Sequence, residues 1–176
     1  MARQYASVEM RVEVRAARPG DGAGLARVWL ENASYYVRLF PDDFRMPDQV
    51  GLVESFEVRL GGPRSASELR LVAVVDGVVA AFVYARLTDP DDGAAREMLA
   101  DRPYRRVHVE ALGTSNAFQR QGLATRLVEA VEAWAREQGA RFVSAGTYLE
   151  SSVAIPFWEQ RMGYRRRSVI LAKRLE

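Results

Sequence analysis

The chain has 176 residues, the length of one domain that buries a single core. Its 25 Lys and Arg residues nearly balance 23 Asp and Glu residues, and the absence of cysteine excludes disulfides, thiolate metal sites and a cysteine nucleophile. No apolar run approaches the roughly 20 residues of a membrane-spanning helix, and residues 1–13 lack the hydrophobic stretch of a signal peptide. We therefore expect one domain over residues 1–176, cytoplasmic and without a membrane partner.

The predicted elements follow from side-chain periodicity and from turn signals. Residues 10–16 alternate apolar and charged side chains as a strand does, and Asp21 in the turn after them is a candidate helix N-cap. Asp76-Gly77 separates two β-rich runs and predicts a two-residue hairpin, while Gly139 is placed to end the clearest helix. In chain order the elements are a strand at 10–16, helices at 25–36 and 47–60, strands at 69–75, 78–87 and 107–114, a helix at 122–138, a strand at 141–147, a helix at 151–161 and a closing strand or hairpin at 164–175.

This order of elements constrains the fold. Three consecutive strands in the middle of the chain favour antiparallel pairing, whereas the strand-helix-strand unit at 107–147 requires a parallel crossover. We therefore expect an α/β fold with a mixed, mostly antiparallel central sheet of six to seven strands, flanked by about four helices. Residues 88–103 form a polar insertion with one expected helical turn around 94–100.

The segment most informative for chemistry runs over residues 112–124. A strand ends there, and a turn that carries Gly122 opens a long helix. The first N–H groups of such a helix and its positive dipole end can bind phosphate groups, and a glycine lets the ligand approach the backbone closely. The alternative is that Gly122 only eases a turn.

Two segments carry a family resemblance. In the first, Gln119, Gly122 and Ala124 fill the fixed positions of Gln/Arg-x-x-Gly-x-Gly/Ala, and the segment resembles motif A of the GCN5-related N-acetyltransferase (GNAT) superfamily. In the second, residues 151–164 resemble motif B of the same superfamily, commonly Asn-x-x-Ala-x-x-Phe-Tyr followed by Gly-Phe. The resemblance implies a GNAT-like fold and an N-acetyltransferase whose acyl donor is acetyl-CoA.

The same resemblance implies which residues hold the donor. The end of the strand would pair through its backbone with the pantetheine arm, and the N–H groups of residues 120–125 would hold the pyrophosphate. The implied acetyl-CoA contacts are Leu112, Gly113, Thr114, Gln119, Arg120, Gln121, Gly122, Leu123, Ala124, Thr125 and Ser151. We expect no metal, because one histidine without cysteine argues against a zinc site.

Two residues of the strand at 107–114 are candidates for the general base. An amine must lose a proton before it can attack a thioester, and a carboxylate or histidine usually accepts that proton. Glu110 and His108 are two positions apart, so an unbroken strand points both to one face. We expect Glu110 to be the base and His108 to be the second candidate. The alternatives are a solvated or ion-paired Glu110 and a His108 that bonds a neighbour.

The second motif departs from the family pattern at two positions. Ser151 stands where asparagine is usual, and Trp158 stands where the family often has the tyrosine that protonates the thiolate. The indole N–H is a poor proton donor, so that role is vacant or has moved. Tyr148 and Tyr164 are possible replacements, although each can equally be a packing residue.

We therefore expect an acetyl-CoA-dependent N-acetyltransferase that acts by direct attack. The acceptor is an amine of a small molecule or of a protein, and the aromatic and acidic loop at 34–44 either binds it or packs into the core. The alternative is an acyl-CoA-binding sensor or interaction module without catalysis, which Trp158 favours. Nucleic-acid binding by the arginines at 165–167 is not expected, and a homodimer is possible.

Overall fold

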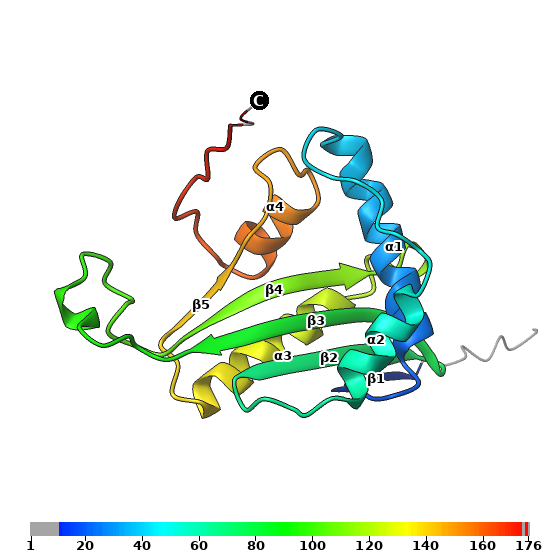
Figure 1. Cartoon of the computed structure of the whole chain (residues 1–176), viewed down its shortest axis with the longest axis horizontal. Helices are drawn as coiled ribbons and strands as arrows, with labels where there is room; N and C mark the ends of the chain where they lie inside the picture. Colours follow the sequence, from blue (N-terminus) through cyan, green and yellow to red (C-terminus); the bar gives the residue numbers. More distant parts are fainter. Residues whose placement is uncertain (1–10, 174, 176) are drawn as a thin grey trace, which may run out of the picture. The chain divides into compact units, whose positions relative to one another are not determined.

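The computed structural model of the protein describes residues 11–173 and residue 175, and residue 10 of the first predicted strand lies outside this part. A central sheet with helices on both faces makes up most of it (Figure 1). In chain order the elements are β1 (Val12–Ala16), α1 (Gly22–Leu39), α2 (Leu52–Gly61), β2 (Glu68–Val75), β3 (Val78–Thr88), the 3₁₀ turn η1 (Ala94–Arg96), β4 (Arg106–Thr114), the 3₁₀ turn η2 (Asn116–Phe118), α3 (Leu123–Glu137), β5 (Phe142–Ala145), α4 (Ala154–Pro156) and the π-helical turn η3 (Phe157–Arg161).

The sheet has five strands in the order β1-β2-β3-β4-β5. Neighbours pair antiparallel except β4 and β5, which are parallel and joined by α3, so the predicted mixed α/β sheet is confirmed. The prediction of six to seven strands is wrong, because within the described residues the stretch after 163 forms no strand. Val169, Ile170 and Leu171 are 62%, 92% and 91% exposed. A β-rich sequence becomes a strand only where another strand takes its backbone hydrogen bonds.

Helices α1 and α2 cover one face of the sheet, and α3 covers the other (Figure 1). The core under α1 and α2 is one apolar cluster, and burial of such side chains is the main source of folding free energy. Its buried members are Ala17, Leu25, Val28, Val72, Val74, Val79 and Phe82, with Phe56, Leu60 and Ala111 packed against them. On the other face, Leu123, Leu127 and Val131 of α3 are at most 1% exposed.

The start of α1 is capped in a way that its sequence does not indicate. Asp21 stands at the predicted N-cap position, but its side chain makes no hydrogen bond to the helix within the described structure. Its carboxylate instead accepts two hydrogen bonds from Arg15, at 2.7 and 2.8 Å. Glu57 of α2 accepts the N–H groups of Gly20 and Gly22, at 2.9 and 2.7 Å. The carboxylate that satisfies this helix end therefore comes from a neighbouring helix.

Helix α3 begins and ends as its sequence predicts, within one residue. Gly122 precedes it with a φ of 77°, and Gly139 follows it with a φ of 71°, both in the left-handed region that favours glycine. The N–H of Gly139 donates to Arg136, and the N–H of Ala140 donates to Ala135, which is the Schellman pattern of helix ends. These two glycines determine where α3 begins and ends.

The chain divides into two compact units between Ala145 and Gly146. The first unit contains the sheet and helices α1 to α3. In the second unit, Trp158 is buried and packs edge-on against Phe157 and Tyr164, with ring centroids 5.1 and 4.9 Å away. The backbone N–H of Tyr164 donates to the carbonyl of Trp158 at 2.8 Å. Trp158 is therefore a core residue of its unit.

Candidate active site

The outer edge of β4 is paired along only part of its length. The register between β4 and β5 runs from Arg106–Phe142 to Val109–Ala145, while β4 itself continues to Thr114. Among the described residues, no strand pairs with the outer edge of β4 beyond Val109. Backbone N–H and C=O groups on that edge can therefore pair with an extended ligand, as they would with another strand.

Glu110 lies at a β-bulge that coincides with the start of this unpaired edge. On β3, Tyr84 faces Ala111 and Ala85 faces Val109, so Glu110 is the extra residue of the bulge. The bulge interrupts the strand, so the expectation of an unbroken strand is wrong at this residue. The side chain of Glu110 is 40% exposed, and its Oε1 lies 3.8 Å from Nε of Arg86. Bulges commonly redirect a side chain, and this one carries the candidate base.

His108 is held by the neighbouring strand. Its Nδ1 lies 2.9 Å from the hydroxyl oxygen of Ser144, the residue beside it on β5. On the other side it faces Arg86, the same arginine that contacts Glu110. Because in-register neighbours share a face, His108 and the guanidinium that pairs with Glu110 are on the same side of the sheet. His108 thus has a polar partner of its own, and Glu110 has an ionic one.

A polar network continues from Arg86 across β3 to β2. The hydroxyl of Tyr84 donates to Glu68 at 2.9 Å, and Nη2 of Arg86 donates to the Tyr84 oxygen at 2.7 Å. The hydrogen bond from Tyr84 lowers the pKa of Glu68, and the positive charges of Arg70 and Arg86 act in the same direction. The hydrogen bond with Tyr84 raises the pKa of Arg86. Glu68 and Arg86 are therefore both charged at neutral pH.

Between β4 and α3 the chain makes the turn that the first motif predicts. Arg120 and Gly122 both have positive φ angles, 61° and 77°. A side chain at Gly122 would meet no atom within 4 Å, so the space in front of this turn is open. Leu123 is 1% exposed, and its side chain belongs to the core, so only its backbone can face a ligand. Leu112, Gly113 and Thr114 lie on the unpaired edge that leads into this turn.

The start of α3 has the electrostatics of an anion site. Within the described residues, no side chain caps this end, and the first turn contains no acidic residue. The N–H of Arg126 donates to the carbonyl of Gly122 at 3.1 Å, so the N–H groups of Leu123 and Ala124 lie at the helix end, where intrahelical acceptors run out. The remaining predicted donor contacts, Gln119, Arg120, Gln121, Ala124 and Thr125, all belong to this turn and to the first turn of the helix.

Gly113 of β4 lies against Asn32 of α1 and Phe82 of β3. A Cβ placed there would be 2.7 Å from Cε1 of Phe82 and 2.8 Å from Nδ2 of Asn32. Such distances are shorter than real Cβ contacts, so a larger residue would push α1 away from the strand. The glycine therefore allows α1 to pack directly on the end of β4.

Helix α1 also binds the chain just after β4, which the sequence did not indicate. Oε2 of Glu31 accepts the backbone N–H of Asn116 at 2.6 Å, and Nη1 of Arg27 donates to the hydroxyl of Ser115 at 2.9 Å. Arg27 and Glu31 form an i,i+4 ion pair at 3.3 Å. The i,i+4 spacing of Arg27 and Glu31 is the only sign of this contact in the sequence, and the same spacing is typical of exposed helices in general. The polar set of Arg27, Glu31, Ser115 and Asn116 is called the α1 clamp below.

The end of α1 carries an aromatic cluster that continues into the following loop. The ring of Tyr36 stacks on Phe44 at 4.9 Å with an interplanar angle of 24°, and on Phe40 at 6.4 Å with an angle of 26°. Tyr35 meets Tyr36 edge-on at 5.2 Å. The aromatic side chains of the loop predicted at 34–44 thus pack on one another, and each of them is only half-buried.

The second unit contains the last predicted donor contact, Ser151. It is 1% exposed, and its hydroxyl accepts the N–H of Ala154 at 3.1 Å. This hydroxyl therefore bonds the first residue of α4, whose N-cap position is Val153. The role of Ser151 toward pantetheine stays a prediction.

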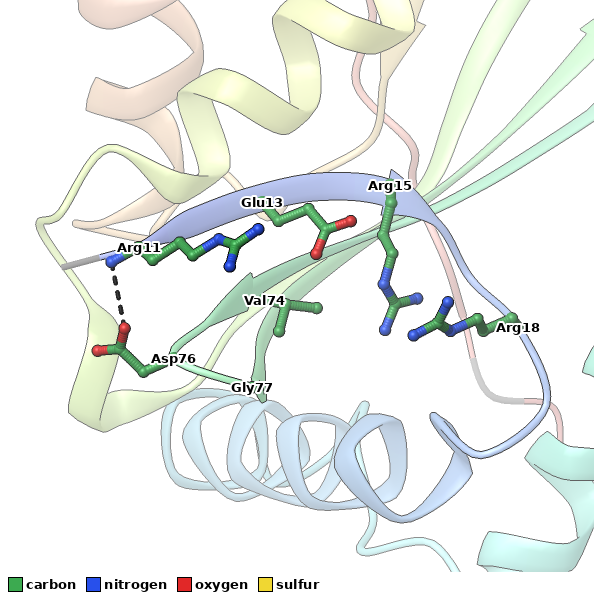
Figure 2. Close-up of a pocket in the computed structure, with 7 residues that line it drawn as sticks. All are labelled: Arg11, Glu13, Arg15, Arg18, Val74, Asp76 and Gly77. Carbon is green, nitrogen blue, oxygen red and sulfur yellow. Dashed lines mark hydrogen bonds between the residues drawn. The ribbon is translucent and has the colours of Figure 1, made fainter.

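A separate pocket of about 260 Å³ lies on β1 and on the hairpin between β2 and β3 (Figure 2). Its charged lining is mixed: Arg11, Arg15 and Arg18 are accompanied by Glu13 and Asp76. The carboxylate of Asp76 accepts the backbone N–H of Arg11 at 3.2 Å, shown as the dashed line (Figure 2). This pocket belongs to β1, so it has no part in the site on β4.

Two further observations bear on the kind of site. In the part of the chain that the structure describes, no group of three or more His, Cys, Asp or Glu side chains could hold a metal ion. No helix of residues 11–173 is both long and apolar enough to span a membrane.

Solved structures share this fold at low sequence identity. A tetramutant of the BH1408 protein from Bacillus halodurans superposes with a TM-score of 0.76 at 16% identity, covering 93% of this chain and 99% of that one. The aminoglycoside N-acetyltransferase AAC(6')-Iy in complex with CoA gives 0.65 at 17% identity, covering 97% and 98%. A ribosomal-protein-alanine N-acetyltransferase from Brucella melitensis biovar Abortus gives 0.62 at 18% identity, covering 93% and 99%.

The sequence itself decides the family. No curated protein matches the chain closely enough to serve as a relative. The model of the acetyltransferase (GNAT) family, however, matches residues 33–164, which is more than half of the chain and includes both motifs. The chain therefore belongs to the acetyltransferase (GNAT) family of N-acetyltransferases.

Proposed function

We propose that the protein transfers the acetyl group of acetyl-CoA to an amine by direct attack, with Glu110 as the general base. The observation that carries this proposal is the unpaired edge of β4, which starts at the bulge of Glu110 and runs into the turn before α3. One strand thus presents a carboxylate, a free backbone edge and a path to an anion-binding helix end. These are the three features that the reaction needs.

Acetyl-CoA fits the residues that are present. Its pantetheine arm is an extended amide chain, which suits the backbone of Leu112, Gly113 and Thr114. Its pyrophosphate suits the open turn at Gly122, because nothing lies within 4 Å of a Cβ there and the first helical turn has no acidic residue. The positive charge of Arg120 stands in the same turn. A related enzyme with this fold has been solved in complex with CoA, which supports the same donor here.

The proposed reaction has three steps, and protein groups act in the first two. The amine, with a pKa near 10.4 in water for a lysine-like group, loses its proton to the carboxylate of Glu110, directly or through water. The neutral nitrogen attacks the thioester carbon, and the N–H at or next to Leu112 stabilises the oxyanion that forms. The carbon–sulfur bond then breaks, CoA leaves as the thiolate, and the nitrogen loses its second proton to solvent. The product is an amide.

No tyrosine stands at the family's usual position for the general acid. Trp158 occupies it and is buried between aromatic rings of its own unit. A thiolate is a fair leaving group, so we propose that solvent protonates it after departure. A pH profile of turnover without a descending limb in the range of tyrosine ionisation would agree with this proposal.

The acceptor is proposed to be an amine that binds at the aromatic cluster at the end of α1. Aromatic rings attract cations, and Asp42 and Asp43 in the same loop add negative charge. Structures with this fold include enzymes named for aminoglycosides and for a ribosomal protein, so both small and protein amines are candidates. Turnover of free polyamines and aminoglycosides, compared with that of peptides bearing a free N-terminus or lysine, decides between them.

A second candidate function is an acyl-CoA-binding module without catalysis, and Trp158 at the usual tyrosine position favours it. Release of free thiol from acetyl-CoA, measured with a panel of amines, separates the two. We expect wild-type turnover with at least one amine and a loss of about 100-fold or more in Glu110→Gln. The matched control is Glu13→Gln, an exposed strand glutamate at the opposite edge of the sheet, which should keep full activity. Binding of acetyl-CoA without turnover of any amine would favour the module.

The assembly and location belong to the same proposal. We propose a homodimer, because Val169, Ile170 and Leu171 expose apolar side chains. We also propose a cytoplasmic protein that does not bind nucleic acid. Light scattering of the purified protein tests the dimer. Binding assays with DNA and RNA at low and high salt test the absence of nucleic-acid binding, and we expect no binding at either salt concentration.

A further inference from the structure

Ser115 is the residue that follows β4, and both its backbone and its hydroxyl are held by hydrogen bonds. The N–H of Ser115 donates to the carbonyl of Ala80 at 2.8 Å. Its hydroxyl accepts from Nη1 of Arg27 at 2.9 Å and donates to Oε1 of Glu31 at 3.3 Å. Ser115 is 1% exposed, and a buried hydroxyl that lost these partners would be costly. The exit from β4 is therefore determined by α1 and β3 together.

Glu31 extends this control to the next residue. Its Oε2 accepts the backbone N–H of Asn116 at 2.6 Å, across 85 positions of sequence. A hydrogen bond from an amide to an ionised carboxylate is stronger than one between neutral groups. The carboxylate stays in place because Arg27 pairs with it, and Nη2 of Arg27 is itself held by the carbonyl of Val79 at 2.6 Å. The α1 clamp is therefore a connected network and not a single contact.

The network reaches the first motif through Asn116. The amide nitrogen of Gln119 donates to Oδ1 of Asn116 at 3.1 Å. Asn116 is thus bound by Glu31 at its backbone and by Gln119 at its side chain. Gln119 opens the turn whose left-handed residues, Arg120 and Gly122, lead into α3. A carboxylate on α1 is therefore connected to this turn through Asn116.

We propose that Glu31 is a positioning residue for acyl-CoA: it holds the turn at 115–122 in the shape that binds the ligand's diphosphate. This inference rests on the proposed function, because it assumes that the turn is the diphosphate site. A turn that is already ordered binds with less loss of conformational entropy than one that must become ordered. Loss of the clamp should therefore weaken CoA binding without removing any group that touches CoA.

Calorimetric titration with CoA measures this effect. Glu31→Ala should raise the Kd by about 10-fold, the change expected for one hydrogen bond to a charged group. Glu31→Gln keeps one oxygen that can accept the Asn116 N–H but loses the charge that pairs with Arg27, so it should raise the Kd by less than Glu31→Ala does. Glu31→Asp keeps the charge beside Arg27 but shortens the reach, so it should raise the Kd as well. This last variant covers the case in which the alanine variant does not fold.

Glu57 provides the matched control. Its carboxylate also accepts backbone N–H groups at one end of α1, those of Gly20 and Gly22, but far along the helix from the clamp. Glu57→Ala should lower the Tm and leave the Kd for CoA unchanged. A common effect of both alanine variants on the Kd would mean that general destabilisation, not positioning, is responsible, and it would overturn the inference.

Hydrogen exchange of the ligand-free protein gives a readout that is independent of CoA. We expect faster exchange at 115–122 in Glu31→Ala and unchanged exchange there in Glu57→Ala. The positioning role alone would be overturned if the wild type binds CoA and Glu31→Ala changes neither the Kd nor the exchange at 115–122. Absence of CoA binding in the wild type would overturn the proposed function and this inference together.

Discussion

Nε of Arg86 on β3 lies 3.8 Å from Oε1 of Glu110, the bulge residue of β4. The same arginine donates to the hydroxyl of Tyr84, which donates to Glu68 on β2. The candidate base is therefore the last member of a polar chain that crosses three strands on one side of the sheet. Arg86 is its ionic partner, and the bulge determines its position along the strand.

Replacement of Arg86 tests whether this chain orients the base. We expect Arg86→Met to lower kcat by about 3- to 10-fold and to leave the Kd for acetyl-CoA unchanged, because the carboxylate loses its partner but remains present. The side chain of Arg86 is 52% exposed, so the free energy of unfolding should change little. Steady-state kinetics and urea unfolding measure the two quantities. A kcat as low as that of Glu110→Gln would contradict a purely orienting role.

Gly122 offers a test of the diphosphate site. Gly122→Glu should weaken CoA binding by roughly 100-fold or more, because it places a negative charge at the positive end of α3. The φ of 77° strains any side chain there, so Gly122→Ala serves as the control for strain alone and should lose much less affinity. The Kd values from calorimetry decide. Equal affinities of the two variants would argue against an anion at this turn.

Gly113 offers a test of the packing between α1 and β4. Gly113→Ala should lower the free energy of unfolding by about 1–3 kcal/mol, because its Cβ would lie 2.8 Å from Nδ2 of Asn32 on α1 and 2.7 Å from Cε1 of Phe82 on β3. The control is Gly61→Ala at the end of α2, where a Cβ meets nothing within 4 Å and alanine favours the helix. Urea unfolding should show a loss for the first variant and no loss for the second. The reverse order would refute the close approach of α1.

The ion pair between Arg15 and Asp21 should make stability depend on pH. Burial alone would raise the pKa of Asp21, but the hydrogen bonds from Arg15 and from the N–H of Arg18, with the charges of both arginines, outweigh burial and lower that pKa below its ordinary value of 3.8. A carboxyl whose pKa is lower in the folded state stabilises the protein above its unfolded pKa. That stabilisation is lost as the pH falls toward the folded value.

Asp21→Asn measures this contribution. At pH 7 we expect the free energy of unfolding to fall by about 3 kcal/mol, because Arg15 is left partly buried without its partner. The difference between wild type and variant should be constant from pH 7 to about 5, and it should shrink below pH 4. Denaturant unfolding at several pH values checks this. A difference that grew in acid would show that the pKa of Asp21 is raised instead.

Local sequence signals predicted the local structure well. Asp76 and Gly77 both have positive φ angles, 47° and 85°, as the hairpin signal requires. Gly122 and Gly139 bracket α3, and both have the left-handed φ angles that favour glycine. These features depend on a few neighbouring residues, so the sequence contains all the information that determines them.

The features that define the site depend on partners far away in sequence. Nothing around Glu110 marks a bulge, since the bulge arises from how β4 pairs with β3. The hydrogen bond from Asn116 to Glu31 joins positions 85 apart, and Glu57 caps a helix that precedes its own. The number of strands was overestimated for the same reason, because a β-rich closing stretch does not contain its own partner.

Calorimetric titration of the wild-type protein with acetyl-CoA tests the central claim most directly, with CoA and ATP as comparisons. We expect micromolar binding of acetyl-CoA and CoA and much weaker binding of ATP, because the unpaired edge of β4 needs the pantetheine arm as its partner. Equal affinities for ATP and CoA would contradict a role for that edge. No binding of acetyl-CoA would contradict the proposed transfer reaction itself.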